Sequence, residues 1–143
     1  MFSKSCEYAI KAMLYVCVET RDGKRLSITQ IAKEINAPEA FTAKILQTLA
    51  RHEKISSIKG PGGGFYISAD APPVKVMEIV DIMDGKAAFE RCGLGLKKCG
   101  DKRPCPIHKE FRSYSSRLKN LLETKTIEEM SRDIRLGKSF LMN

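Results

Sequence analysis

Three of the five cysteines and one of the two histidines lie within Arg91–His108, "RCGLGLKKCGDKRPCPIH". Their spacing is Cys92-x6-Cys99-x5-Cys105-x2-His108. The stretch has no apolar periodicity, so packing in a hydrophobic core does not explain it. Thiolates and imidazoles are ligands of zinc and of iron–sulfur clusters, and thiols alone can sense oxidants. The stretch therefore predicts a metal site, a cluster site or a metal-free thiol sensor.

The sequence around the third cysteine predicts how two of the ligands are placed. Pro106 suits the first position of a helix, which puts Cys105 at the N-cap, where free N–H groups and the helix dipole stabilise a thiolate. His108 follows three residues later, so its imidazole can approach the Cys105 sulfur. The glycines of the stretch leave Cys92 and Cys99 free to reach the same centre. Neighbouring lysines also favour thiolates.

The spacing alone does not choose between zinc and an iron–sulfur cluster. The CxxC doublets of zinc ribbons are absent, and so are the ferredoxin spacings. An enzyme with Cys105 and His108 as nucleophile and base is disfavoured, because the sequence offers no orienting third residue. The other two cysteines, Cys6 and Cys17, fall on an apolar helical stripe, and we expect both to be small buried hydrophobes.

Composition favours a polyanionic partner. The chain has 143 residues, a net charge of +8 and a pI near 9.3, which suit a single domain with an appendage that binds nucleic acid rather than membrane. No apolar run approaches the ~18 residues of a membrane span, and the N-terminus does not read as a signal peptide. With an odd cysteine count, we expect a cytoplasmic protein with reduced thiols.

The first half of the chain predicts a helix-turn-helix. A helix over residues 2–19 is followed by a second that starts at Ser27, in a Ser-x-x-Gln capping box, and ends near Asn36. A third helix over residues 38–52 follows after a tight turn. Its predicted buried side chains are Phe41, Ile45, Leu46 and Leu49.

A β-hairpin is predicted directly after these helices. The short runs Ile55–Ile58 and Phe65–Ser68 flank the glycine-rich "KGPGGG", and no Walker lysine or helix follows that would make it a phosphate loop. A hairpin at this place in the order is typical of the wing of a winged helix. Lys59 at its tip is placed to reach phosphate or the minor groove.

The third helix has a polar face opposite its buried one, as a helix in the major groove needs. Small residues there permit close approach, and cations and an amide can contact bases. The residues expected at the DNA interface are Ser27, Thr29, Gln30, Ala40, Ala43, Lys44, Gln47, Arg51, Lys59 and Gly60.

The second half of the chain predicts two more helices and a short one at the end. A helix begins at "APP" (71–73), turns Val76, Met77, Val80 and Met83 inward and ends at Gly85. Another begins at Pro106, and Thr126 and Glu129 cap the last. The helix after Pro106 carries apolar residues at spacings of 4, 3, 4 and 3, a heptad seam that fits a partner helix from a second copy or, alternatively, its own domain. The seam residues are Ile107, Phe111, Tyr114, Leu118 and Leu121.

The predicted fold is mainly α: a winged helix-turn-helix with a two-stranded β wing and a long C-terminal dimerisation helix. Residues 1–85 form the DNA-binding domain and residues 86–105 the cysteine-bearing loop. Residues 106–143 hold the dimerisation helix and the short last helix.

Several phrases resemble one known family. The helix "EYAIKAMLYV", the segment "ITQIAKEINAP", the wing "GPGGGF" within "ILQTLARHEKISSIKGPGGGFYIS", and three cysteines ahead of a long helix are similar to the bacterial Rrf-type regulators, which include IscR and NsrR. The resemblance implies a homodimer with crossed long helices that binds double-stranded DNA at a palindromic or near-palindromic operator. It also implies an iron–sulfur cluster, with two or four irons, on the three cysteines.

Two points of the resemblance bear on the ligands. The first interval here has six residues, where five is the common count in the family. IscR-like members use a histidine shortly after the third cysteine, which matches His108; others use an acidic residue of the partner's first helix, which corresponds to Glu7. We expect cluster status, set by redox, nitric oxide or iron, to gate operator affinity. A zinc-binding Cys3His structural or interaction protein and a metal-free thiol-sensing regulator are the alternatives.

Overall fold

The computed structural model describes residues 1–141 and confirms the predicted fold class, a mainly helical winged-helix protein with one two-stranded sheet. The last two residues of the predicted 106–143 segment lie outside the described residues. The elements in chain order are α1 Lys4–Glu19, α2 Ile28–Glu34, α3 Glu39–Arg51, β1 Ser56–Ile58, β2 Gly64–Tyr66, α4 Val76–Asp84, α5 His108–Thr124 and α6 Ile127–Arg135.

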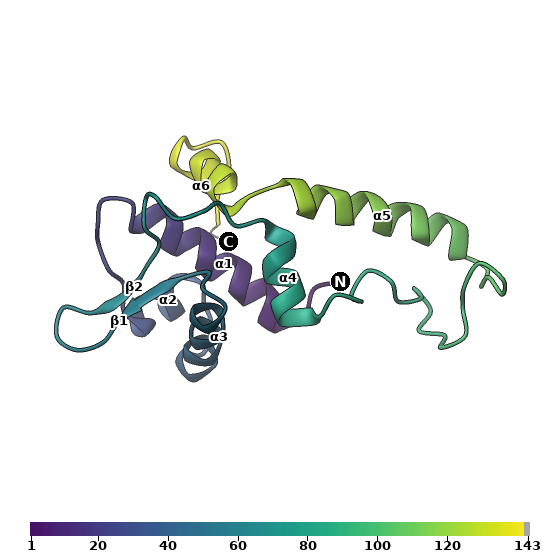
Figure 1. Ribbon diagram of the computed structural model, residues 1–143, viewed down its shortest axis with the longest axis horizontal. Coiled ribbons are helices and arrows are strands. Elements are labelled where there is room, and N and C mark those ends of the chain that lie inside the picture. Colours follow the sequence, from purple (N-terminus) through teal and green to yellow (C-terminus); the bar gives the residue numbers. More distant parts are fainter. Residues whose placement is uncertain (142–143) are drawn as a thin grey trace.

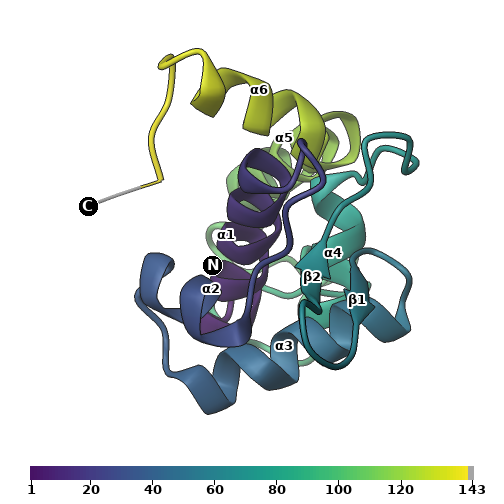
Figure 2. The ribbon, with the colours of Figure 1, turned by 90° about the vertical axis from the view of Figure 1, so that its left-hand side faces the viewer.

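Helix α1 forms the centre of a compact body made of every element except α5. It packs against α3, α4 and α6, because three of its sides carry small or apolar side chains. Figures 1 and 2 place α6 and α3 on opposite sides of α1. Cys6 and Cys17 are 0% and 9% exposed, which confirms that both belong to the core.

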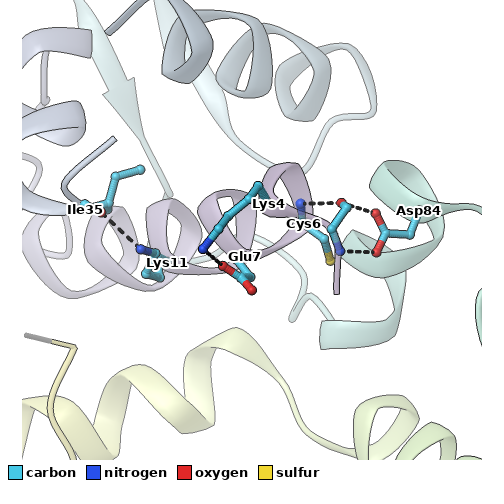
Figure 3. A network of polar contacts seen from close by, with 7 residues as sticks. Lys4, Cys6, Glu7, Lys11, Ile35 and Asp84 are labelled. Carbon is cyan, nitrogen blue, oxygen red and sulfur yellow. Dashed lines mark hydrogen bonds and ion pairs between the residues drawn. The ribbon is translucent and has the colours of Figure 1, made fainter. Parts of the chain in front are cut away.

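Polar contacts fix the start of α1 to the end of α4 (Figure 3). Ser3 is the N-cap: its hydroxyl accepts from the N–H of Cys6, 3.1 Å away, and helix α1 therefore begins two residues later than the predicted 2–19. The backbone N–H and the hydroxyl of Ser3 both donate to the carboxylate of Asp84. The segment that leads into the cysteine loop thus leaves the body from a fixed point.

The helix-turn-helix forms as the sequence predicts, with one exception. Ser27 and Gln30 make the reciprocal capping box, and Asn36 has the left-handed φ of 53° that turns the chain toward α3. The prediction that Phe41 is buried is wrong, because its side chain is 37% exposed and its ring packs edge-on against Tyr8 at 5.8 Å. Thr42 is buried instead and donates to the carbonyl of Pro38, since a helix that buries residues 45, 46 and 49 also turns residue 42 inward.

The wing is an antiparallel hairpin in which Ser56 pairs with Tyr66 and Ile58 with Gly64. A third segment joins it, because the backbone of Leu26 donates to and accepts from Phe65 at 2.9 and 2.8 Å. Gly64 has a φ of 145°, and a Cβ there would lie 2.7 Å from the carbonyl oxygen of Leu26. Glycine is therefore required where the wing joins the body.

Helix α4 starts at Val76, five residues after the predicted Ala71, and ends at Gly85 as predicted. Ile79 is fully buried, whereas Met83, which was predicted to point inward, is only partly buried. The backbone between α5 and α6 is tied to the start of α4: the N–H of Val76 donates to the carbonyl of Lys125 and that of Ile127 to the carbonyl of Val74.

Helix α5 projects from the body, and the segment of residues 86–107 runs from the end of α4 to the outer, N-terminal end of α5 (Figure 1). Leu122 is its one buried residue among those described. Thr126 and Glu129 cap α6 as predicted. Because α6 packs on α1, the end of the predicted 106–143 segment lies against the winged-helix body. No helix within residues 1–141 is long and apolar enough to cross a membrane.

Candidate metal centre and nucleic-acid interface

The structure brings the three clustered cysteines together at the start of α5. Their sulfur atoms all lie within 4.8 Å of one another, and the sulfurs of Cys92 and Cys105 are 3.7 Å apart. All three are free thiols, partly exposed, on the wall of a cavity of about 80 Å³. Two sulfurs each ~2.3 Å from a tetrahedral metal would lie close to ~3.8 Å apart, so this arrangement fits sulfur ligands that share one centre.

His108 lies beside this group, against a different cysteine from the one expected. Its Nδ1 is 3.2 Å from the sulfur of Cys99, and its Nε2 is 3.0 Å from a carboxylate oxygen of Asp101. A carboxylate on the second nitrogen fixes the ring and the tautomer of a metal-binding histidine. Sequence reasoning missed Asp101 as a partner of His108; the signal available was one acidic residue among the lysines and the arginine of residues 97–103.

The prediction that Cys105 caps the helix is wrong. Helix α5 begins at His108 with Ile107 as its cap, because Ile107 has a φ of −111° and a ψ of 10°, which are not helical. Pro106 therefore lies in a turn that closes with a hydrogen bond from the N–H of His108 to the carbonyl of Cys105, 3.0 Å. The helix dipole does not act on the Cys105 sulfur from the cap position.

Backbone N–H groups, rather than a helix end, stabilise the thiolate form at this site. Hydrogen bonds from the backbone of Leu96, then Leu94, help to lower the pKa of the Cys92 thiol to about 7, and the Leu94 nitrogen is 3.4 Å from its sulfur. The pKa of Cys99 is raised: a backbone hydrogen bond from Cys105 opposes the change, but desolvation and the neighbouring sulfurs outweigh it. The three thiols are therefore not equivalent.

Other residues near the site bear on the fourth ligand. Glu7, on α1, pairs with Lys4 at 2.9 Å and is not grouped with the three sulfurs in the single chain; its contribution from a second copy stays a prediction. Glu90 lines the same cavity as the cysteines.

The loop packs on α5 at Gly93. Its backbone lies so close to Phe111 that a Cβ at Gly93 would come within 2.7 Å of that ring. The loop thus rests on α5 through a glycine.

The residues predicted to contact DNA lie on α2, α3 and the hairpin. Lys44, Gln47 and Arg51 are exposed, as is Ala40, whereas Ala43 is partly buried. Figure 2 places α3 and the hairpin tip on the side of the molecule away from α6. The exposed residues of the predicted interface outside α3 are Ser27, Thr29, Gln30, Lys59 and Gly60.

Several of these side chains already have partners within the chain. Gln30 accepts from the backbone of Ser27 at 2.9 Å, and the Thr29 hydroxyl donates to Glu39 at 2.9 Å.

Arg25, which sequence reasoning missed, contacts the wing. Its Nη1 donates to the carbonyl of Gly62 at 3.2 Å, and its guanidinium lies over the Tyr66 ring. Arg25 therefore holds the wing in place.

The predicted dimer seam is an apolar stripe on α5 that nothing in the single chain covers fully. Tyr114 is 69% exposed and Leu121 48%, and only Leu118 is partly buried. Ile107 and Phe111 complete the stripe and are also exposed. The alternative expectation was that this face of α5 packs on its own domain. The contacts within the chain leave the stripe largely uncovered.

Comparisons with known proteins agree with this architecture. The family model described as "Rrf2: Iron-dependent Transcriptional regulator" matches residues 2–133. The chain is 30% identical over 124 residues to the HTH-type transcriptional regulator IscR of Klebsiella pneumoniae, an alignment that covers 86% of this chain and 74% of that relative.

Two solved structures share the fold. CymR, the global cysteine regulator of B. subtilis, matches with a TM-score of 0.73 at 17% identity, covering 92% of this chain and 96% of that one. IscR of T. potens matches with a TM-score of 0.72 at 18% identity, covering 98% and 92%.

Proposed function

The chain belongs to the Rrf2 family of transcriptional regulators, and from this premise we propose that it is a cytoplasmic, homodimeric DNA-binding regulator whose operator affinity is gated by an iron–sulfur cluster on Cys92, Cys99 and Cys105. The observation that carries the proposal is the convergence of three free sulfurs within 4.8 Å in a loop without a core of its own. A loop of this kind gains order from a shared ligand.

The donor types of this site suit such a group, and the spacing of the three sulfurs suits a single metal ion equally well. The three cysteines supply sulfur ligands, and His108, oriented by Asp101, is the proposed fourth, with a second copy's Glu7 as the alternative. When bound, an iron–sulfur cluster supplies a centre that reacts with oxidants and nitric oxide and depends on iron supply. A non-sulfur fourth ligand makes one position of such a site easier to open.

The chain itself offers a route from this site to the dimer. Cys105 is hydrogen-bonded to the first residue of α5, and Gly93 rests on Phe111, one of the seam residues. If a bound ligand fixes the position of the loop, these contacts also fix the position of the start of α5 and of its apolar stripe. Because the C-terminal end of α5 is tied to the start of α4, a shift of the paired α5 helices changes the distance between two recognition helices.

DNA contact is proposed through α3 in the major groove and the wing along the backbone. Two copies related by a two-fold axis fit a palindromic or near-palindromic operator, with half-sites one or more helical turns apart. A coupling of ~1–3 kcal/mol between the site and the DNA-competent arrangement gives about 5- to 150-fold control.

Anaerobic isolation followed by absorption, iron, sulfide and zinc analysis tests the proposal. We expect a coloured protein with iron and sulfide, a dimeric mass, and different operator affinities before and after the iron is removed. A colourless protein with one zinc per chain would contradict it and support the Cys3His structural alternative. A metal-free protein whose affinity changes on thiol oxidation would support thiol sensing instead.

A further inference from the structure

The tip of the wing is the part of the expected DNA interface with the least packing of its own. Residues 59–62 are all exposed, and Gly60 and Gly62 have φ values of 90° and 74°. One hydrogen bond closes a turn inside the tip, from the N–H of Gly63 to the carbonyl of Gly60 at 2.9 Å. A glycine-rich tip of this kind loses much conformational entropy if it is ordered only when Lys59 meets DNA.

Arg25 contacts this tip from outside the hairpin. Its Nη1 donates to the carbonyl of Gly62 at 3.2 Å, and its guanidinium carbon lies 5.7 Å from the centre of the Tyr66 ring on β2. Within residues 1–141, no other side chain makes a hydrogen bond to residues 59–63. Arg25 therefore links the exposed tip to the strand behind it.

The backbone next to Arg25 is itself firmly anchored. Leu26 is 1% exposed and exchanges two backbone hydrogen bonds with Phe65, at 2.9 and 2.8 Å. The segment between α1 and α2 accordingly runs beside β2 (Figure 2). The Arg25 side chain thus extends from a fixed point to the tip of the wing.

The contacts of Arg25 depend on the shape of its head group as well as on its charge. A guanidinium is planar, so it can lie over an aromatic ring and donate a hydrogen bond from its edge at the same time. A lysine ammonium carries the same charge but has no plane that could meet both partners. Arginine and lysine at position 25 are therefore not equivalent for the wing.

We propose that Arg25 is a positioning residue for operator binding, which orders the wing tip in the free protein and so presents Lys59 to the DNA. The inference rests on the proposed DNA-binding function and on the expected phosphate contact of Lys59. Binding by a tip that is already ordered loses less conformational entropy than binding by a loose one. Arg25 acts through Lys59 and not through a phosphate contact of its own.

Backbone dynamics of the full chain without DNA test the first half of this inference. Heteronuclear NOE values of the Gly60, Gly62 and Gly63 amides report motion of the tip on the picosecond-to-nanosecond scale. Arg25→Lys should lower these values toward those of a flexible loop. It should leave Tm within about 2 °C of the unchanged chain, because the lost contacts lie on the surface. Lys24→Ala, which removes the neighbouring exposed cation, should change neither quantity.

A double-mutant cycle tests the second half, with fluorescence anisotropy on an operator duplex selected from random sequences. Arg25→Lys should weaken binding about threefold and leave the slope of log affinity against log salt unchanged, because no charge is lost. Lys59→Ala should weaken it about fivefold. The combined variant should also be only about fivefold weaker, since a tip without Lys59 gains little from being positioned.

Three results would overturn the inference while leaving the proposed function intact. The first is unchanged NOE values in Arg25→Lys. The second is a combined variant about fifteenfold weaker, which would mean that Arg25 and Lys59 act independently. The third is full affinity in Arg25→Lys with a salt slope reduced by about 1 in Arg25→Ala, which would mean that Arg25 contacts a phosphate directly. Failure of the unchanged chain to bind any duplex would instead overturn the proposed function, and this inference with it.

Discussion

The five cysteines occupy two regions, and the contrast between them is greatest for Cys6 and Cys92. Cys6 lies in the body with no exposed surface, and burial raises the pKa of its thiol to about 12. Cys92 lies in the loop, where the N–H groups of Leu96 and Leu94 help to lower the pKa of its thiol to about 7. The role of a cysteine here depends on whether its surroundings offer apolar packing or hydrogen-bond donors.

The body and the loop also differ in the interactions that stabilise them. The body has a continuous apolar core centred on α1, whereas no residue from 86 to 107 is buried. A segment without buried apolar surface has little to offset the entropy of ordering it. The body is therefore stable by packing. The loop depends on Ala88 and Phe89, which pack partly buried against the core, on the few contacts it makes with α5 and, under our proposal, on its ligand.

The largest expected difference between the regions concerns the cofactor. Replacing Cys92, Cys99 or Cys105 with Ala should abolish the visible chromophore of anaerobically isolated protein, because each removes one of three converging sulfurs. Cys6→Ala, the matched control in the core, should retain the chromophore and lose only about 1 kcal/mol of unfolding free energy. A loop variant with full colour and iron would remove that residue from the ligand set.

Alkylation of the metal-free, reduced protein compares the thiols directly. With pKa values of about 7 and about 12, the thiolate fractions of Cys92 and Cys6 at pH 7 differ by roughly 10⁵. The iodoacetamide rate at Cys92 should rise with pH up to about 7 and then level off, since the thiolate is the reactive form and it predominates above its pKa. Peptide mapping by mass spectrometry follows both sites. Equal labelling of Cys6 and Cys92 in folded protein would contradict the predicted difference between their thiolate fractions.

Two glycine-to-alanine substitutions compare how well the body and the loop accommodate an added methyl group. Gly64→Ala puts a Cβ against the rigid backbone of Leu26 at a φ of 145°, so the unfolding free energy should fall by about 3 kcal/mol. Gly93→Ala meets only the movable Phe111 ring, so the unfolding free energy should change by less than about 0.5 kcal/mol. The Gly93→Ala variant should instead shorten the lifetime of the chromophore in air. Denaturant titration measures the first effect and absorption the second; similar losses of stability would show that the loop is part of the core.

Exposed cations give the smallest expected effect. Lys59→Ala and Arg51→Ala should each weaken operator binding about fivefold and reduce the slope of log affinity against log salt by about 1, because under our proposal each side chain contacts one phosphate. Lys97→Ala, an equally exposed lysine on the loop, should leave both quantities unchanged. Fluorescence anisotropy at several salt concentrations distinguishes them, and a larger effect from Lys97 would move the interface to the loop.

Local rules predicted the elements and much of the site. The Ser27–Gln30 capping box, the turn at Asn36 and the wing around the glycines each depend on contacts within a few residues, and each forms as predicted. The three cysteines were also grouped correctly from their spacing. The errors lie in side-chain orientations and in a helix start. Phe41 turned outward, Met83 is only partly buried, and α5 begins at His108 rather than at Pro106, so Cys105 does not cap it.

What the sequence by itself determined is the order of elements and the kind of chemistry, because helical periodicity, caps and sulfur ligands are properties of residues close together in the chain. Only the tertiary structure decided which partners meet across long separations. Arg25 on Gly62 of the wing, Gly93 on Phe111 and Ser3 on Asp84 depend on how segments far apart in the chain pack together. No local pattern encodes such contacts, since they follow from the global minimum of packing and hydrogen bonding.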